Sequence, residues 1–74
     1  MTKTLGVGII GVGGIAPTHA MAIGNTPGAQ LVASATRNEA HGTSFAEKFG
    51  GAWCADYREL LQRADVDIVI ISAP

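Results

Sequence analysis

Near the N-terminus, the stretch GVGIIGVGGIA carries glycines at a spacing typical of phosphate-binding loops, and it does so in two registers. The first register uses Gly6, Gly8 and Gly11. The second uses Gly11 and Gly13, with Ala16 as the small third residue. In such loops the free peptide N–H groups at a helix start bind a diphosphate, so the functional register must lie between a strand and a helix.

The position of the first strand separates the two registers. The apolar run 5–10 predicts a strand that is buried on both faces, and Gly6 and Gly8 fall inside it, where they cannot hold an anion. The second register starts directly after Ile10, and the apolar spacing over 15–23 predicts a helix there. We therefore predict that the second register is the phosphate loop.

Each small residue of this register has its own predicted task. Gly11 makes the turn after the strand, and Gly13, which lacks a β-carbon, lets the backbone approach a diphosphate closely. The N–H groups of Gly13, Gly14 and Ile15 are predicted to face the phosphates at the positive end of the helix. Ala16 is small enough for the helix to lie near the strand. The alternative is that these glycines only form a tight strand-to-helix turn.

Strand and helix signals alternate along the whole chain. Asn38 is a suitable cap for the second helix, and Asp56 with Glu59 has the spacing of a capping box for the third. This alternation, with right-handed crossovers, predicts an α/β fold: a partial doubly wound (Rossmann) parallel sheet in the order 3-2-1-4, with helices on both faces. The predicted strands cover 5–10, 31–36, 52–54 and 67–73, and the helices cover 15–23, 39–49 and 56–63.

The end of the second strand is the next candidate site. In Rossmann folds an acidic residue there binds the ribose hydroxyls of NAD, whereas a nearby arginine accommodates the 2′-phosphate of NADP. Here Thr36 ends the strand, Arg37 and Asn38 follow, and the nearest carboxylate, Glu39, lies in the next helix. A guanidinium pairs with phosphate through two hydrogen bonds, so these residues favour NADP over NAD. Two alternatives stay open for Arg37, stacking on the adenine of either cofactor and a solvated loop position.

Composition excludes several other classes of protein. The 74 residues include 5 basic and 6 acidic side chains without a basic stripe, which argues against a nucleic-acid partner. The longest apolar run, 66–73, is too short to span a membrane. Cys54 is the single cysteine, so we expect no disulfide and no metal site, and a reducing, cytoplasmic location.

Several stretches of the chain together resemble one known family. The loop VGIIGVGGIA is followed by PGAQLVASATR, FAEKFG, DYRELL and DVDIVIISAP, and this pattern is similar to the start of the glucose–fructose oxidoreductase and inositol dehydrogenase family. The resemblance runs from Leu5 to Pro74. Thr36 replaces the family's usual Asp at the end of the second strand, which is similar to the NADP-using members.

The resemblance implies a reaction as well as a cofactor. Relatives pass a hydride between nicotinamide and a carbon that bears a hydroxyl, often on a sugar or cyclitol. Ser72 and Pro74 are then expected near the nicotinamide half of the cofactor. The family's catalytic lysine in a Glu-Lys-Pro motif, its histidine and its substrate domain are not found in these 74 residues. The resemblance therefore implies that residues 1–74 are the N-terminal part of a dinucleotide-binding domain, without catalytic residues of their own.

The last predicted strand indicates that copies of the chain associate with one another. One of its sides carries unpaired backbone groups along an apolar run, so we expect a homo-oligomer that forms through this edge. Two rival functions stay open. One is a stand-alone dimeric nucleotide-binding module without catalysis, and the other is a truncated structural fragment that binds nothing.

Overall fold

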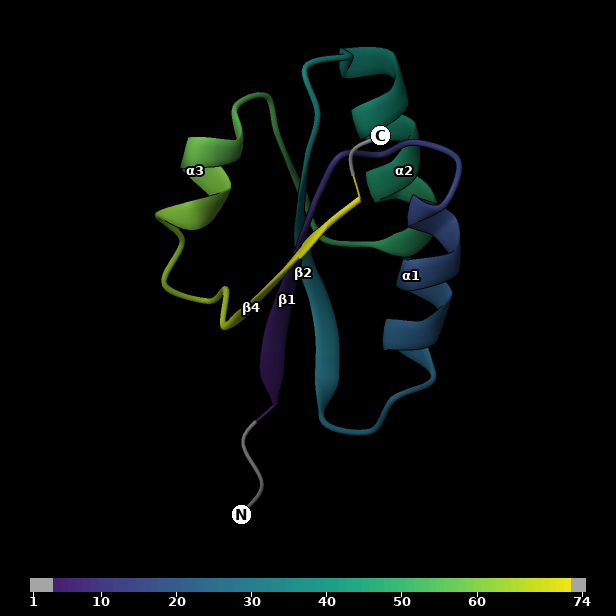
Figure 1. Ribbon diagram of the computed structural model, residues 1–74, viewed down its shortest axis with the longest axis vertical. Coiled ribbons are helices and arrows are strands. Elements are labelled where there is room, and N and C mark those ends of the chain that lie inside the picture. The colour runs from purple at the N-terminus through teal and green to yellow at the C-terminus, as the bar shows by residue number, and fades with distance from the viewer. Residues whose placement is uncertain (1–3, 73–74) are drawn as a thin grey trace.

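The computed structural model describes residues 4–72, and within them strands and helices alternate in the predicted order. Continuous apolar runs form the strands, and apolar residues one turn apart define the buried sides of the helices. The elements are β1 (Leu5–Ile10), α1 (Ala16–Gly24), β2 (Ala29–Ala35), α2 (Glu39–Phe49), β3 (Ala52–Cys54), α3 (Tyr57–Leu61) and β4 (Ile68–Ile71), as drawn in Figure 1.

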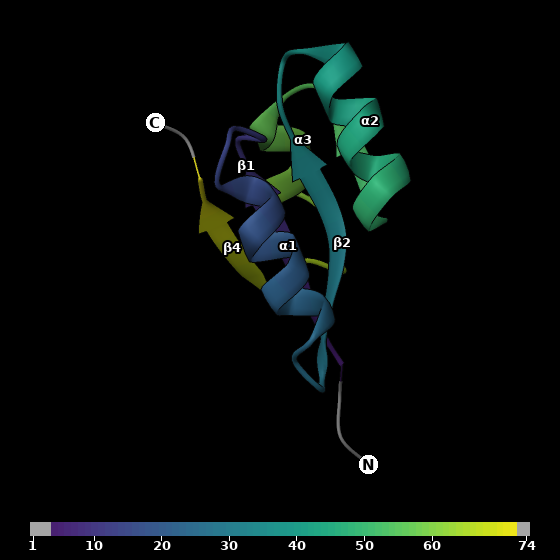
Figure 2. The ribbon, with the colours of Figure 1, turned by 90° about the vertical axis from the view of Figure 1, so that its right-hand side faces the viewer.

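The four strands form one parallel sheet in the order β3-β2-β1-β4. Helices α1 and α2 cover one face of this sheet and α3 covers the other, as Figure 1 and Figure 2 show. The predicted Rossmann-type fold is therefore confirmed, including its strand order and the helices on both faces. The order arises because right-handed crossovers add β2 and β3 on one side of β1 before β4 returns to the other side.

The larger core lies between the sheet and the pair α1 and α2. Val7 and Ile9 of β1 enter it from the sheet, and Ile23 enters it from α1. From α2, Phe45 is buried in this core and Phe49 packs against it, with 4.8 Å between the two ring centroids. This core holds α1 against the strand that precedes it, which fixes the position of the connecting loop.

Gly6 and Gly8 lie within β1, as predicted, and the space beside them is filled from the α3 side. A β-carbon on Gly8 would lie only 2.7 Å from Cδ2 of the fully buried Leu60. A β-carbon on Gly6 would overlap the carbonyl oxygen of Asp65. The two glycines therefore let α3 and the loop after it pack directly on the backbone of β1.

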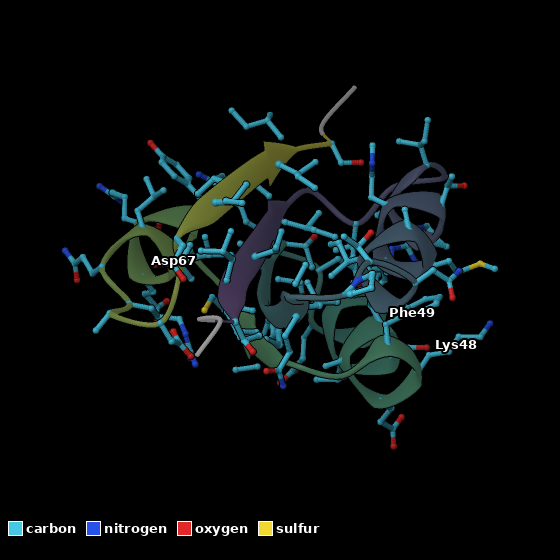
Figure 3. All side chains as sticks on the ribbon, turned by 90° about the horizontal axis from the view of Figure 1, so that it is seen from below. Lys48, Phe49 and Asp67 are labelled. Carbon is cyan, nitrogen blue, oxygen red and sulfur yellow. The ribbon has the colours of Figure 1, made fainter. Side chains whose placement is uncertain are left out.

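Asp67 fastens the start of β4 to the start of β1. Its carboxylate accepts a 2.8 Å hydrogen bond from the N–H of Gly6, and its own N–H donates to the Gly6 carbonyl at 2.7 Å. Figure 3 shows Asp67 on the opposite side of the view from Lys48 and Phe49, which belong to α2. These bonds set the register between the two strands.

Some element boundaries differ from the predicted ones. Helix α3 is shorter than predicted. Asp56 is its N-cap, as predicted, but its carboxylate accepts the N–H of Arg58 at 2.8 Å and not that of Glu59, which the capping-box spacing indicated. Strand β2 starts earlier than predicted because Ala29 pairs with Leu5. Strand β4 is shorter than predicted, and the end of its predicted range lies outside the described residues.

Candidate functional site

The carboxyl ends of β1, β2 and β3 lie at one edge of the sheet because the strands are parallel, and this is the upper edge in Figure 1. The loops 11–15, 36–38 and 55–56 follow these strands and meet there, although they are far apart in the sequence. In doubly wound sheets ligands bind at this edge, beside the strand where the order reverses. That strand is β1, since β2 lies on one side of it and β4 on the other.

Gly11 turns the chain out of β1 in a conformation that favours glycine. Its φ angle is 94°, which side chains other than glycine rarely adopt. Its N–H donates a 2.8 Å hydrogen bond to the carbonyl of Ala35 at the end of β2. The tight turn predicted at this position is therefore present, and its geometry by itself explains Gly11.

Gly13 and Gly14 are exposed, and nothing in the packing explains why they are glycines. Neither has a positive φ angle, and a β-carbon at either position would meet no atom within 4 Å. The alternative that the glycines serve only a tight turn thus fits Gly11 but not these two. Bare backbone beside open space is what the close approach of a ligand requires.

The start of α1 leaves peptide N–H groups without acceptors. Ile15 is the N-cap residue, and its side chain makes no capping hydrogen bond. Within residues 4–72, the N–H groups of Gly13, Gly14 and Ile15 have no acceptor. Unpaired N–H groups and the positive end of the helix dipole together favour an anion at this point.

A cavity of about 170 Å³ opens between the ends of β1, β2 and β3. Thr36 and Arg37, two of the residues predicted as a site at the tip of the second strand, line it. Asn38 does not line it, and its side-chain oxygen instead caps α2 by accepting the N–H of His41 at 3.0 Å. The lining consists of Ile10, Gly11, Ala35, Thr36, Arg37, Ala55, Asp56 and Tyr57.

Three lining residues, Ala55, Asp56 and Tyr57, follow β3 and do not stand out in the sequence as site residues. The predicted strand order could have identified them, because β3 pairs with β2 and the residues that follow the two strands therefore lie side by side. Trp53 adds a positioning contact, since its Nε1 donates a 2.9 Å hydrogen bond to the carbonyl of Thr36. The indole thereby holds the tip of β2 in place beside the cavity.

Ser72 follows β4 on the far side of β1 from this cavity. The N–H of Ser72 donates to the carbonyl of Ile10 at 2.8 Å, which places Ser72 beside the start of the glycine loop, residues 11–15. Ser72 is 8% exposed, and its hydroxyl has no hydrogen-bond partner in the described part of the chain. A buried hydroxyl without a partner costs about 1–3 kcal/mol, which a ligand reaching it would offset. Pro74, predicted at the same end of the site, lies outside the described residues.

The charged groups at the cavity are Arg37, Asp56 and, next to Asp56, Arg58. The Arg58 guanidinium bonds both carboxylate oxygens of Asp56, with a shortest N···O distance of 2.7 Å. Hydrogen bonds from the side chain and backbone of Arg58 lower the pKa of Asp56 to about 2, and the charge of Arg37 adds a smaller effect in the same direction. Asp56 is therefore ionised at neutral pH.

Cys54, at the end of β3, is a buried free thiol. Burial raises its pKa, while the nearby charge of Arg63 opposes the shift, so the thiol is protonated at neutral pH and a poor nucleophile. Within residues 4–72, no three His, Cys, Asp or Glu side chains are grouped so that they could hold a metal ion. Of the helices in that range, none has the length and apolarity to cross a bilayer.

Residues 5–74 match the GFO/IDH/MocA oxidoreductase family, which has an NAD-binding Rossmann fold. Glucose-6-phosphate 3-dehydrogenase of Bacillus subtilis (strain 168) is 38% identical over 63 residues, which make up 85% of this chain and 18% of that protein. Among solved structures, KijD10, a 3-ketoreductase from Actinomadura kijaniata in complex with NADP, is 34% identical with a TM-score of 0.91 over 97% of this chain and 23% of its own. GenD2 from gentamicin A biosynthesis, in complex with NAD, is 30% identical with a TM-score of 0.91 over 100% of this chain and 21% of its own.

The chain thus spans about a fifth of the length of these relatives. The match covers β1, the glycine loop and every later element of the sheet, so it confirms the resemblance seen in the sequence. The chain belongs to the GFO/IDH/MocA family of oxidoreductases, and residues 5–74 match the NAD(P)-binding Rossmann fold of that family.

Proposed function

We propose that the chain binds a nicotinamide dinucleotide with the diphosphate on the glycine loop and the adenosine in the cavity. One observation carries this proposal: within residues 4–72 the N–H groups of Gly13, Gly14 and Ile15 have no acceptor, and a β-carbon on Gly13 or Gly14 would meet no atom within 4 Å. Diphosphate oxygens are suitable acceptors for such groups at a helix start. The cavity leads from this loop to Thr36 and Arg37, where the adenosine ribose would lie.

Within this proposal, NADP is the preferred cofactor. Arg37 lines the cavity, is exposed, and has no hydrogen bond or ion pair to any of the residues 4–72, so its guanidinium is available to a 2′-phosphate. Thr36 stands where an NAD-specific carboxylate would bind the ribose, and Glu39 is not part of the lining. KijD10 holds NADP and GenD2 holds NAD, so the preference depends on the residues of this chain.

The reaction proposed is hydride transfer between nicotinamide and a carbon that bears a hydroxyl or keto group on a sugar. This proposal is supported by the similarity to a glucose-6-phosphate 3-dehydrogenase and a 3-ketoreductase. Ser72 and Pro74 would lie on the nicotinamide side. Residues 1–74 would act as the N-terminal part of the cofactor domain, and the substrate and catalytic groups would belong to another domain. We place this reaction in the cytoplasm, where a free thiol such as Cys54 stays reduced.

Arg37→Ala is expected to weaken NADPH binding by about 1.5–3 kcal/mol, the range for a hydrogen bond to a charged group, and to leave NADH binding nearly unchanged. The loss corresponds to a roughly 10- to 150-fold higher dissociation constant. Calorimetric titration with NADPH and NADH measures both affinities. Trp53 fluorescence provides a second readout because the indole is hydrogen-bonded to Thr36 beside the cavity.

Lys48→Ala is the matched control, because it also removes one positive charge, in this case from α2. Lys48 lies in the last turn of that helix and its side chain points away from the sheet (Figure 3). This change should alter neither affinity by more than about twofold. If Arg37→Ala lost equal amounts of affinity for NADPH and for NADH, this would argue for adenine stacking and against a 2′-phosphate contact. If the unmodified chain bound neither cofactor, the proposed function would be refuted.

The free edge of β4 supports a proposal about assembly, that two copies of the chain associate. Among the described strands β4 pairs only with β1, and Ile68 and Ile71 are 44% and 73% exposed. An unpaired edge with apolar side chains favours pairing with another chain, and a two-fold pairing of β4 edges would make one continuous sheet. We expect sedimentation at micromolar concentration to show a dimer. A monomer throughout that range would contradict this assembly.

A further inference from the structure

A carboxylate lines the cavity in which the 2′-phosphate is placed. Asp56 and Arg37 both belong to the lining. Asp56 is ionised at neutral pH with or without Arg58, because the ordinary pKa of an aspartate lies far below that pH, and hydrogen bonds from Arg58 lower the pKa of Asp56 further, to about 2. An ionised carboxylate here repels a phosphate and competes with it for the Arg37 guanidinium. The cavity therefore contains a charge that opposes the preferred ligand, unless another group offsets it.

Arg58 is that group. Its Nε lies 3.1 and 3.2 Å from Oδ1 and Oδ2 of Asp56, and its Nη2 lies 2.7 Å from Oδ2. Oδ1 also accepts the backbone N–H of Arg58 at 2.8 Å, which caps α3. Arg37, by contrast, has no ion pair with any described residue, although its charge acts on Asp56. The folded chain thus holds the carboxylate on Arg58 and leaves Arg37 free.

We propose that the Asp56–Arg58 ion pair is a specificity-determining element for NADP, in which Arg58 keeps Asp56 away from Arg37 and so keeps Arg37 available to the 2′-phosphate. This inference rests on the proposed preference for NADP. Arg58 acts as a positioning residue through Asp56, without touching the cofactor. Its side chain is 72% exposed and is not part of the cavity lining.

Arg58→Gln is expected to reduce the preference for NADPH. Without its partner, the carboxylate of Asp56 pairs with Arg37 or faces the phosphate directly. The dissociation constant for NADPH should rise about threefold to tenfold at low ionic strength, while that for NADH stays within about twofold. The difference should shrink as salt is added, because the groups are solvent-exposed. Arg58→Lys, which keeps the positive charge, should restore most of the preference.

Asp56→Asn distinguishes a positioning role from direct contact with the cofactor. Asparagine still caps the helix but removes the negative charge, so α3 should be preserved. In this background, Arg58→Gln should cause no further loss of NADPH affinity, because there is no carboxylate left to hold. An equal loss in both backgrounds would mean that Arg58 binds the phosphate itself, and would overturn the proposal.

Arg63→Gln is the matched control for a broken ion pair. Arg63 and Asp65 are also two residues apart, with a 2.8 Å N···O distance, and neither lines the cavity. The ratio of NADPH to NADH affinity should not change in this variant. If that ratio falls in Arg37→Ala but not in Arg58→Gln, the inference fails and the proposed function stands. If the unmodified chain binds neither cofactor, or binds both equally, the inference fails with the proposed NADP preference.

Discussion

Gly13→Ala is expected to weaken NADPH binding about 100-fold while leaving the fold intact. The new β-carbon would occupy the space beside the loop where we place the diphosphate, and would move its oxygens away from the N–H groups. Losing two charged hydrogen bonds of about 1.5 kcal/mol each amounts to this factor. Because the β-carbon meets no protein atom within 4 Å, the free energy of unfolding should change by less than about 1 kcal/mol. Calorimetric titration and urea unfolding measure the two quantities.

Gly24→Ala is the control for this prediction, at the opposite end of α1. Gly24 has no positive φ angle, and a β-carbon there would also meet no atom within 4 Å. It lies far along the helix from the proposed diphosphate position, so NADPH affinity should be unchanged. A similar loss of affinity in Gly13→Ala and Gly24→Ala would mean that the first substitution acts through the helix and not through ligand contact.

Gly6→Ala is expected to lower the free energy of unfolding by about 3 kcal/mol, the upper part of the range for overpacking a core. Its β-carbon would overlap the Asp65 carbonyl, which is backbone and cannot move aside as a side chain could. The same strand position is tied to Asp67 by two hydrogen bonds, so a shift would also strain that contact. A domain of this size has a total stability on the order of 5 kcal/mol, so urea unfolding should show a much lower midpoint.

Gly6→Ala and Gly13→Ala together test which register of the glycine motif has which role. The first should reduce stability, and under conditions where the variant remains folded its NADPH affinity should be close to that of the unmodified chain. The second should do the reverse. A stable Gly6→Ala variant with lost NADPH affinity would contradict the assignment of Gly6 to packing.

Much of the fold was predictable because its signals are local. Apolar runs, helical spacing and glycine positions predicted every element within 4–72, and the rule for crossovers predicted the strand order. The same local signals identified Gly11 as the turn and the N–H groups of Gly13, Gly14 and Ile15 as unpaired, both of which the structure contains. Element ends were less predictable, since the first residue of β2 depends on its pairing with β1.

Other features depended on contacts between distant segments. The reason for Gly42 in α2 is that a β-carbon there would overlap the indole of Trp53, whose hydrogen bond holds Thr36. Asp56 and Tyr57, which follow β3, line the same cavity as Arg37, which follows β2.

The sequence alone determined the order of elements, the family and the position of the glycine turn between the first strand and the first helix, because each depends on residues that are neighbours along the chain. Only the tertiary structure decided that Gly6 and Gly8 serve packing against Leu60 and the Asp65 backbone. It also decided that Asp56 faces the same cavity as Arg37. Arg37 and Asp56 are about 20 residues apart in the sequence, and the pairing of β3 with β2 brings their charges together. Their proximity is therefore set by the sheet and not by any local sequence pattern.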